Sequence, residues 1–174
     1  FLNHQVDPPL MAEIGAEFAR LCGNLCVTKV ATIESSGIAP AQMAALALGV
    51  PMVILKKSQS SILQEGILQT EVVSYTKNTT CQLTLKAKFI SPGERVLLID
   101  DFLANGEAAL GAARLIERAG GQVAAVGIVI EKSFQPGRGQ LELKGYKVIS
   151  LARVARLSQG EIRFVEDGEP RTDA

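Results

Sequence analysis

The chain has 174 residues, the length of a single domain that can bury roughly two-thirds of the surface its unfolded form exposes. Hydrophobic residues make up 47% and charged residues 21%, as in ordinary globular proteins, and the 18 basic residues balance the 18 acidic ones. The balance excludes a net charge that would draw the chain to nucleic acid or to a membrane surface. The longest apolar run, residues 123–130, is far shorter than the roughly 20 residues of a membrane-spanning helix. The three cysteines, an odd number, do not form a disulfide framework and indicate a reducing compartment.

The first part of the chain alternates helices and strands. Asp7 is suited to cap a helix that has Pro8 at its first position. The apolar residues that recur on one face of this helix are Leu10, Ile14, Phe18 and Leu21. A strand is predicted at residues 27–33, a helix at residues 41–49 and another strand at residues 52–56.

The pattern then changes to an antiparallel excursion. Residues 57–66 are polar, and residues 67–75 and 81–90 are predicted to be two strands joined by TKNTT. The apolar residues that alternate with polar neighbours in the second strand are Leu83, Leu85, Ala87 and Phe89. This alternation is typical of a half-buried antiparallel strand.

Strands alternate with helices again in the rest of the chain. A strand at residues 96–99, an alanine-rich helix, a strand at residues 122–131, a short helical stretch and a strand at residues 146–150 are predicted. The order predicts an α/β fold with a parallel sheet flanked by helices and an antiparallel flap at about residues 57–90. We expect residues 1–165 to form one domain and the polar residues 166–174 a mobile tail.

Three polar loops follow predicted parallel strands: ESSG at residues 34–37, DDFLANGE at residues 100–107 and EKSFQPGR at residues 131–138. In parallel α/β sheets, ligands bind beyond the carboxyl ends of the strands. The carboxyl ends of neighbouring parallel strands lie at one edge of the sheet. The sequence therefore predicts a binding site made of these three loops.

The segment ANGEA at residues 104–108 has the features of an anion site. Small residues let a phosphate approach the backbone, and the free N–H groups at the start of a helix carry partial positive charge. No G-K-[ST] or G-x-G-x-x-G pattern is present, so it is neither a Walker loop nor a dinucleotide fingerprint. An ordinary strand–turn–helix corner is the alternative.

Asp100 and Asp101 favour a functional interpretation of this loop. Two adjacent carboxylates repel each other and are poor choices for a purely structural turn. Beside a phosphate they are suited to hydroxyl groups, a magnesium ion or a developing positive charge. A sugar with a 5′-phosphate and a pyrophosphate leaving group offers all three, because its transition state resembles an oxocarbenium ion.

The stretch VLLIDDFLANGEA at residues 96–108 resembles the phosphoribosyl pyrophosphate motif of the type I phosphoribosyltransferase family. The resemblance continues through FLNHQ, ESSGIAP and IEKSFQPGR, and so covers residues 1 to about 164. These stretches are similar to the family members that join xanthine to phosphoribosyl pyrophosphate, giving xanthosine monophosphate and pyrophosphate in purine salvage. The resemblance implies the type I fold with a flexible hood, magnesium accompanying the substrate, a homodimer, and a location in the cytoplasm.

The resemblance also implies roles for individual residues. Asp100 and Asp101 would address the ribose hydroxyls and carry the catalytic role. The residues implied to bind phosphoribosyl pyrophosphate are Ala104, Asn105, Gly106, Glu107 and Ala108 at the 5′-phosphate, and Ser35, Ser36, Gly37, Lys56 and Lys57 at the pyrophosphate. The residues implied to bind xanthine are Asn3, Lys132 and Phe134. The hood would close over the reacting centre and exclude water.

Structural alternatives remain for several of these residues. The serines of ESSG could cap a helix, the two lysines could form a solvated strand end, and Phe134 could belong to the core. His4, the only histidine, is expected to make a local hydrogen bond rather than to act as a base. The sequence does not identify a protein metal ligand.

The functional alternatives are a guanine or hypoxanthine phosphoribosyltransferase, and a purine transcription regulator that senses phosphoribosyl pyrophosphate. The regulator would need a DNA-binding domain or a basic face, and the sequence shows neither.

The chain departs from the family pattern in two places. Several relatives that act on 6-oxopurines carry an acid in the phosphate loop as a general base, and Ala104 occupies that position here. A purine that is partly ionised in solution, such as xanthine, would need less help from a base. The family also has an N-terminal segment ahead of FLNHQ that helps to build the base site. Because the chain begins at Phe1, we expect part of that site to be missing from it.

Overall fold

The computed structural model describes residues 4–58, 64–74, 79–158 and 160–165. Its helices are α1 (Pro8–Cys22), α2 (Ile38–Leu48), α3 (Glu107–Arg118) and α4 (Gly137–Leu143), with 3₁₀ turns at Gly23–Leu25 and Ala87–Phe89. Its strands are β1 (Lys29–Ile33), β2 (Met52–Ser58), β3 (Ile67–Ser74), β4 (Thr79–Lys86), β5 (Arg95–Leu103), β6 (Gln122–Lys132), β7 (Val148–Ser158) and β8 (Glu161–Phe164).

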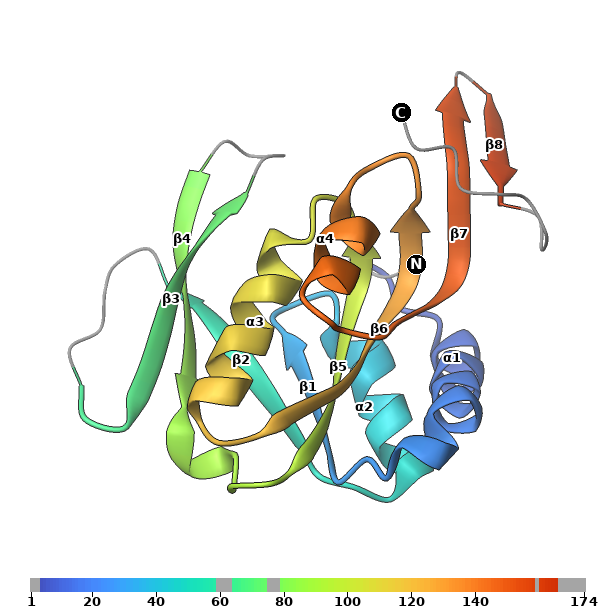
Figure 1. Cartoon of the computed structure of the whole chain (residues 1–174). Helices are drawn as coiled ribbons and strands as arrows, with labels where there is room; N and C mark the ends of the chain where they lie inside the picture. The colour runs from blue at the N-terminus through green and yellow to red at the C-terminus, as the bar shows by residue number, and fades with distance from the viewer. Residues whose placement is uncertain (1–3, 59–63, 75–78, 159, 166–174) are drawn as a thin grey trace.

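These strands form one sheet in the order β3-β4-β2-β1-β5-β6-β7-β8. Five neighbouring strands are parallel to one another: β2, β1, β5, β6 and β7. Strand β4 joins β2 antiparallel, and β8 joins β7 antiparallel. Figure 1 shows α1 and α2 behind the sheet, α3 and α4 in front of it, and the β3–β4 hairpin extending from one side. The predicted α/β class, with helices on a parallel sheet and an antiparallel excursion, is confirmed.

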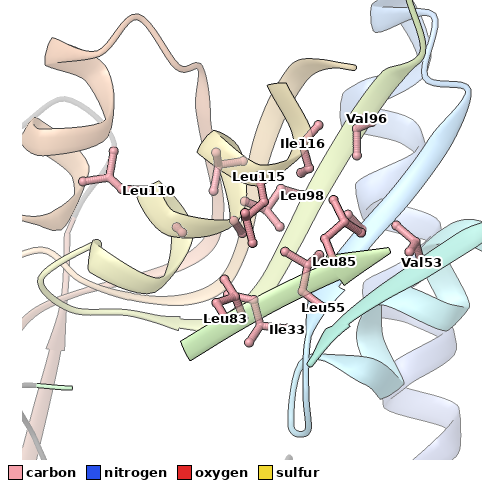
Figure 2. Close-up of a cluster of buried hydrophobic side chains, with 14 of the residues drawn as sticks. Ile33, Val53, Leu55, Leu83, Leu85, Val96, Leu98, Leu110, Leu115 and Ile116 are labelled. Atoms are coloured by element: carbon pink, nitrogen blue, oxygen red, sulfur yellow. The ribbon is translucent and has the colours of Figure 1, made fainter. Parts of the chain in front are cut away.

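Two clusters of buried side chains hold these layers together. The cluster between the sheet and α3 includes Ile33, Leu55, Leu83, Leu98 and Leu115, all at most 3% exposed (Figure 2). The cluster on the other face joins α1 and α2 to the sheet around Phe18, Val30, Ala44, Leu97 and Ile99. Successive residues of a strand therefore serve different clusters, as the pleat requires. Every residue of β1 is buried because helices cover both of its faces.

Helix α1 begins and packs as its sequence predicts. Asp7 caps it, and the carboxylate accepts a hydrogen bond from the Leu10 amide at 3.1 Å. Of the predicted face, Ile14 and Phe18 are buried and Leu10 is half-buried. None of the helices in the described part of the chain is both long and apolar enough to cross a membrane.

Several predicted boundaries were wrong. The predicted strand at residues 81–90 ends at Lys86, and Phe89 lies in a 3₁₀ turn with 49% of its surface exposed, so the alternation does not continue to it. The helix predicted at residues 41–49 begins three residues earlier, because Pro40 is tolerated in its first turn. The strand predicted at residues 146–150 extends to Ser158, where it pairs with β8, a strand that was not predicted. The residues of β8 are exposed, so its sequence has little of the hydrophobic pattern from which a strand is predicted.

Candidate active site

The three predicted loops lie at one edge of the sheet. The carboxyl ends of β1, β5 and β6, drawn as arrowheads in Figure 1, point the same way because these neighbouring strands are parallel. Gly137 is the first residue of α4, and its amide donates to the carbonyl of Ala104 at 2.9 Å. A Cβ placed on Gly37 would lie 3.4 Å from Oδ1 of Asp100. The middle loop is thus hydrogen-bonded to the third loop, and the first loop lies close to Asp100, so the three loops lie together at this edge as predicted.

Asp100 and Asp101 lie within the last four residues of β5. The sequence analysis had placed them after the end of this strand. Both are partly buried, and the Asp101 amide donates to Oδ1 of Asp100 at 3.0 Å. Burial, followed by the neighbouring negative charge of Asp101, raises the pKa of Asp100 to about 8. Asp100 therefore favours its protonated form at neutral pH, and a cationic partner would favour release of the proton.

Thr32 is a further polar residue at this place that the sequence analysis missed. It is fully buried near the end of β1, and its hydroxyl has no hydrogen-bond partner among the described residues. A Cβ on Gly37 would lie only 2.4 Å from this hydroxyl, so a side chain there would displace it. The absence of a side chain at Gly37 thus lets the first loop fold down onto Thr32 and Asp100. The available signal was a hydroxyl among the apolar residues at the end of a predicted strand.

The first loop is tied to the end of β2 through Glu34. Its amide donates to the carbonyl of Leu55 at 3.0 Å, and its carboxylate accepts from the Lys57 amide at 2.6 Å and lies 3.1 Å from Nζ of Lys56. Although burial raises the pKa of Glu34, these contacts lower it overall. The peptide bond between Glu34 and Ser35 is cis. Lys56 and Lys57 thus lie beside the ESSG loop, as predicted, with the Lys56 ammonium engaged by Glu34.

The middle loop ends at Gly106, which precedes α3 and has a φ of +85°. Only glycine adopts such a conformation readily. A Cβ there would lie 3.1 Å from the carbonyl oxygen of Gly137, so the close neighbour of Gly106 is the backbone of the third loop. A side chain at Gly106 would therefore meet the backbone of Gly137. The glycine is needed to fit the two loops together.

At the start of the third loop, the last residue of β6 places an ammonium group over an aromatic ring. Lys132 is the last residue of β6, and its Nζ lies 5.9 Å from the centroid of the Phe102 ring, within the range of a cation–π contact. Phe102 is 43% and Phe134 is 49% exposed. The alternative that Phe134 belongs to the core is therefore wrong. Phe102 was not predicted, and its signal was an aromatic side chain directly after the two acids.

The β3–β4 hairpin occupies the place of the predicted hood. It rests on α3, where a Cβ on Gly111 would lie 2.4 Å from a methyl group of Val72, and where Arg118 donates to the carbonyl of Gln69 at 2.8 Å. Residues 59–63 and 75–78 of the predicted hood lie outside the described residues, as do Asn3 and the tail at residues 166–174. Within the described residues no group of three or more His, Cys, Asp or Glu side chains could hold a metal ion alone.

The family model described as the phosphoribosyl transferase domain matches residues 11–152, which include all three loops. The chain belongs to the phosphoribosyltransferase family. Curated members of this family align with nearly the whole chain. Xanthine phosphoribosyltransferase 1 of Clostridium botulinum is 60% identical over 95% of this chain and 87% of its own length. The xanthine phosphoribosyltransferases of Exiguobacterium sp. and Ectopseudomonas mendocina are 55% and 52% identical over 95% of this chain, and over 86% and 87% of their own lengths.

Solved structures of the family have the same fold. Adenine phosphoribosyltransferase from Thermoanaerobacter pseudethanolicus matches with a TM-score of 0.74 at 27% identity, covering 84% of this chain and 82% of that one. The adenine phosphoribosyltransferase from Rhodothermus marinus matches with a TM-score of 0.74 at 28% identity, covering 85% and 81%. The fold is thus shared by phosphoribosyltransferases whose names differ in the purine.

Proposed function

We propose that the protein transfers the phosphoribosyl group of 5-phosphoribosyl 1-pyrophosphate to xanthine, giving xanthosine 5′-monophosphate and pyrophosphate. The observation that carries this proposal is the identity of 52–60% to proteins named xanthine phosphoribosyltransferase across about 95% of the chain. The site geometry supports it independently of the names, because acids, a helix start and an aromatic–ammonium cluster lie at one edge of the sheet.

The middle loop would hold the sugar phosphate. The residues proposed to bind it are Ala104, Asn105, Gly106, Glu107 and Ala108, at the start of α3, where free backbone N–H groups favour an anion. Ser35, Ser36 and Gly37 would hold the pyrophosphate, with Lys56 and Lys57 at its side. Glu34 keeps this loop against β2, so the amides and hydroxyls of the loop are positioned before the substrate arrives.

Asp100 and Asp101 would act on the ribose. As the bond to pyrophosphate breaks, the sugar ring gains positive charge, and ionised carboxylates beside it lower the energy of that state more than that of the bound substrate. The buried hydroxyl of Thr32, next to Asp100, is available to donate to the ionised pair. The proton on Asp100 in the unliganded protein would leave when the cationic state or a metal approaches.

We expect magnesium to enter with phosphoribosyl pyrophosphate. Mg²⁺ is commonly held by one or two carboxylates together with substrate phosphates, rather than by a cage of protein ligands. The adjacent acids Asp100 and Asp101, without a third acid, histidine or cysteine grouped with them among the described residues, fit that pattern. Bound there, the ion would neutralise charge on the leaving pyrophosphate.

Recognition of the purine would come from Lys132, Phe134 and Phe102. An ammonium group donates hydrogen bonds and accepts none, so it favours a keto oxygen over the amino group of adenine. The exposed rings of Phe102 and Phe134 offer faces for stacking. Asn3 would contribute from the N-terminal segment. No protein base is assigned, since Ala104 stands in the loop position where several relatives carry an acid.

The test measures pyrophosphate release by the full-length protein with magnesium and phosphoribosyl pyrophosphate, using xanthine, guanine, hypoxanthine and adenine. We expect xanthine to be used with the highest kcat/KM and adenine not to be used. A preference for guanine or hypoxanthine would assign the protein to another purine. Tight binding of phosphoribosyl pyrophosphate without turnover of any base would favour the regulator instead.

We further propose that the enzyme is a homodimer in the cytoplasm. The family resemblance supports the dimer, and the odd number of cysteines supports a reducing compartment. Light scattering of the purified protein should give twice the chain mass of 18.5 kDa. A mass equal to that of one chain at micromolar concentration would contradict the dimer.

A further inference from the structure

Glu131 is a buried carboxylate at the end of β6, directly before Lys132. Only 1% of its surface is exposed, and it lies outside the groups to which the reaction has been assigned above. Burying an ionised carboxylate is costly unless it is paired and hydrogen-bonded. Its position within an otherwise apolar strand therefore calls for a physical reason.

The carboxylate is surrounded by donors from three elements. Both of its oxygens accept from Nε of Arg138 at 2.9 Å, and Oε2 also accepts from Nη2 of Arg138 at 2.5 Å. The hydroxyls of Ser133 and Ser150 donate to it at 2.8 Å and 2.5 Å, and Nε of Arg153 lies 3.4 Å away. Burial alone raises the pKa of Glu131, but these donors outweigh it and hold the pKa at about 2. The carboxylate therefore remains ionised throughout the physiological range.

Arg138 also makes hydrogen bonds to groups other than Glu131. Its guanidinium also donates to the Ser150 hydroxyl at 3.0 Å, the Val148 carbonyl at 3.2 Å and the Glu142 carboxylate at 3.2 Å. It is the second residue of α4, so the ion pair fixes the start of this helix against β6 and β7. A bidentate guanidinium–carboxylate pair sets orientation as well as distance.

Glu131 and Arg138 are the first and last residues of the third loop and flank residues 132–137. The Ser133 amide donates to the carbonyl of Val154 in β7 at 2.8 Å, and within the segment the Gln135 amide donates to the carbonyl of Lys132 at 2.9 Å. The ion pair thus joins the two ends of a six-residue segment that carries both Lys132 and Phe134. It therefore ties the end of β6 to the start of α4 on either side of the segment.

We propose that the Glu131–Arg138 pair is the positioning device for purine recognition: it closes the loop so that the Lys132 ammonium and the Phe134 ring are held in place before the base binds. Glu131 does not touch the substrate in this proposal and acts through its neighbours. The benefit lies in preorganisation, because a loop that is already ordered loses less entropy when the base binds. The assignment of the base to this loop rests on the proposed function.

The test compares Glu131→Gln with Glu94→Gln as a matched control. Glu94 is also a partly buried, paired carboxylate: it accepts from Nζ of Lys29 at 2.7 Å and from the Ser91 amide at 2.7 Å. It lies just before β5, at the amino end of the sheet, away from the loops. Both variants are expected to lose thermal stability, so stability alone does not distinguish positioning from simple structural support.

Three measurements distinguish them. Glu131→Gln should raise KM for xanthine by about 10-fold or more, because several charge-assisted bonds to the loop are lost. The affinity for phosphoribosyl pyrophosphate alone should change by less than about threefold, because its proposed ligands are on other loops. Amide hydrogen exchange in residues 132–137 of the unliganded protein should become faster by about 10-fold or more, whereas exchange in residues 104–108 should not. Glu94→Gln should leave all three values as in the native protein.

The outcomes separate this inference from the proposed function. If the native protein does not use xanthine, the proposed function fails, and the exchange measurement still judges whether the pair orders the loop. Unchanged exchange in residues 132–137, or equal losses of xanthine and phosphoribosyl pyrophosphate binding, would overturn the inference. Should Glu131→Gln fail to fold, Ser133→Ala removes one bond to the same carboxylate. It should raise KM for xanthine by about three- to tenfold, and an unchanged KM with unchanged exchange would also overturn the inference.

Discussion

Among the single residues, Lys132 provides the sharpest test of base recognition. A charge-assisted hydrogen bond to a keto oxygen in a closed site is worth about 1.5–3 kcal/mol. Lys132→Ala should therefore lower kcat/KM for xanthine by about 10- to 150-fold and hardly change the affinity for phosphoribosyl pyrophosphate alone. Steady-state kinetics and a binding titration give the two values. The exposed Lys144 serves as the control, since Lys144→Ala removes the same charge away from the loop. If Lys132→Ala lowered the affinity for phosphoribosyl pyrophosphate as much as kcat/KM for xanthine, EKSF would belong to the phosphate site rather than to the base site.

Asp100 and Asp101 should matter most in the transition state. Asp100→Asn and Asp101→Asn keep the shape of the side chain and remove the negative charge that the cationic ribose would meet. We expect kcat to fall by about 100-fold or more, while binding of the nucleotide product weakens much less. Asp7→Asn is the matched control, because Asn also caps helices well and Asp7 lies at the start of α1. A change in affinity alone would contradict the electrostatic role.

Ionised Glu131 should raise the unfolding free energy, and this contribution should decrease as the pH is lowered. Its pKa is about 2 in the folded protein, below the ordinary value of 4.5, so the folded state favours the ionised form. The resulting stabilisation is complete above about pH 4.5 and is lost as the pH falls toward about 2. The loss of unfolding free energy in Glu131→Gln should thus be constant near neutral pH and shrink between about pH 5 and about pH 3.

Urea unfolding of the native protein and the variant across this range measures the difference. The exposed Glu13 serves as a control, since Glu13→Gln should change stability little at any of these pH values. A difference between native protein and Glu131→Gln that grows on acidification would show that the carboxylate is not held ionised by its partners.

At the scale of elements, the fit between the second and third loops depends on Gly106. An alanine there would combine a strained φ with a contact of 3.1 Å to the Gly137 carbonyl. Gly145 has a nearly equal φ of +86° and no atom within 4 Å of a Cβ, so Gly145→Ala isolates the strain. Both variants should lose about 1–2 kcal/mol of stability through this strain.

Only Gly106→Ala should also weaken binding of phosphoribosyl pyrophosphate, by about 10-fold, because small displacements of a preorganised anion site are costly. Calorimetric titration and thermal unfolding of the two variants measure both effects. Similar affinities in the two variants would show that the loops adjust without cost, and that the contact with Gly137 does not shape the phosphate site.

At the scale of the whole molecule, the two core clusters share β1, β5 and β6, so neither can unfold without exposing the other. We therefore expect one cooperative thermal transition, in agreement with the prediction that residues 1–165 form one domain. Phosphoribosyl pyrophosphate with magnesium should raise the unfolding free energy by about 2.7 kcal/mol at a hundredfold excess over its Kd. Calorimetry with and without the ligand provides the test. Two separated transitions would contradict the single domain.

The sequence determined the class of fold and the edge of the sheet at which the candidate site lies. Apolar runs of the length of strands, separated by capped helices, require a sheet covered on both faces, and strands in such a sheet place their following loops at one edge. For this reason the acids, ANGEA and EKSF, which are local sequence patterns, could be predicted to lie together. The family resemblance added the expected chemistry to those positions.

Only the tertiary structure decided which neighbours these residues have. The closeness of Thr32 to Asp100, of Gly106 to Gly137 and of Phe102 to Lys132 arises from strand register and loop path. The four residues that surround Glu131 come from the loop after β6, α4 and β7, and their spacing in the chain carries no pattern. Local periodicity reports which face of an element is apolar. It does not report which side chain from another element fills a given polar contact, because that depends on how the packed layers align in space.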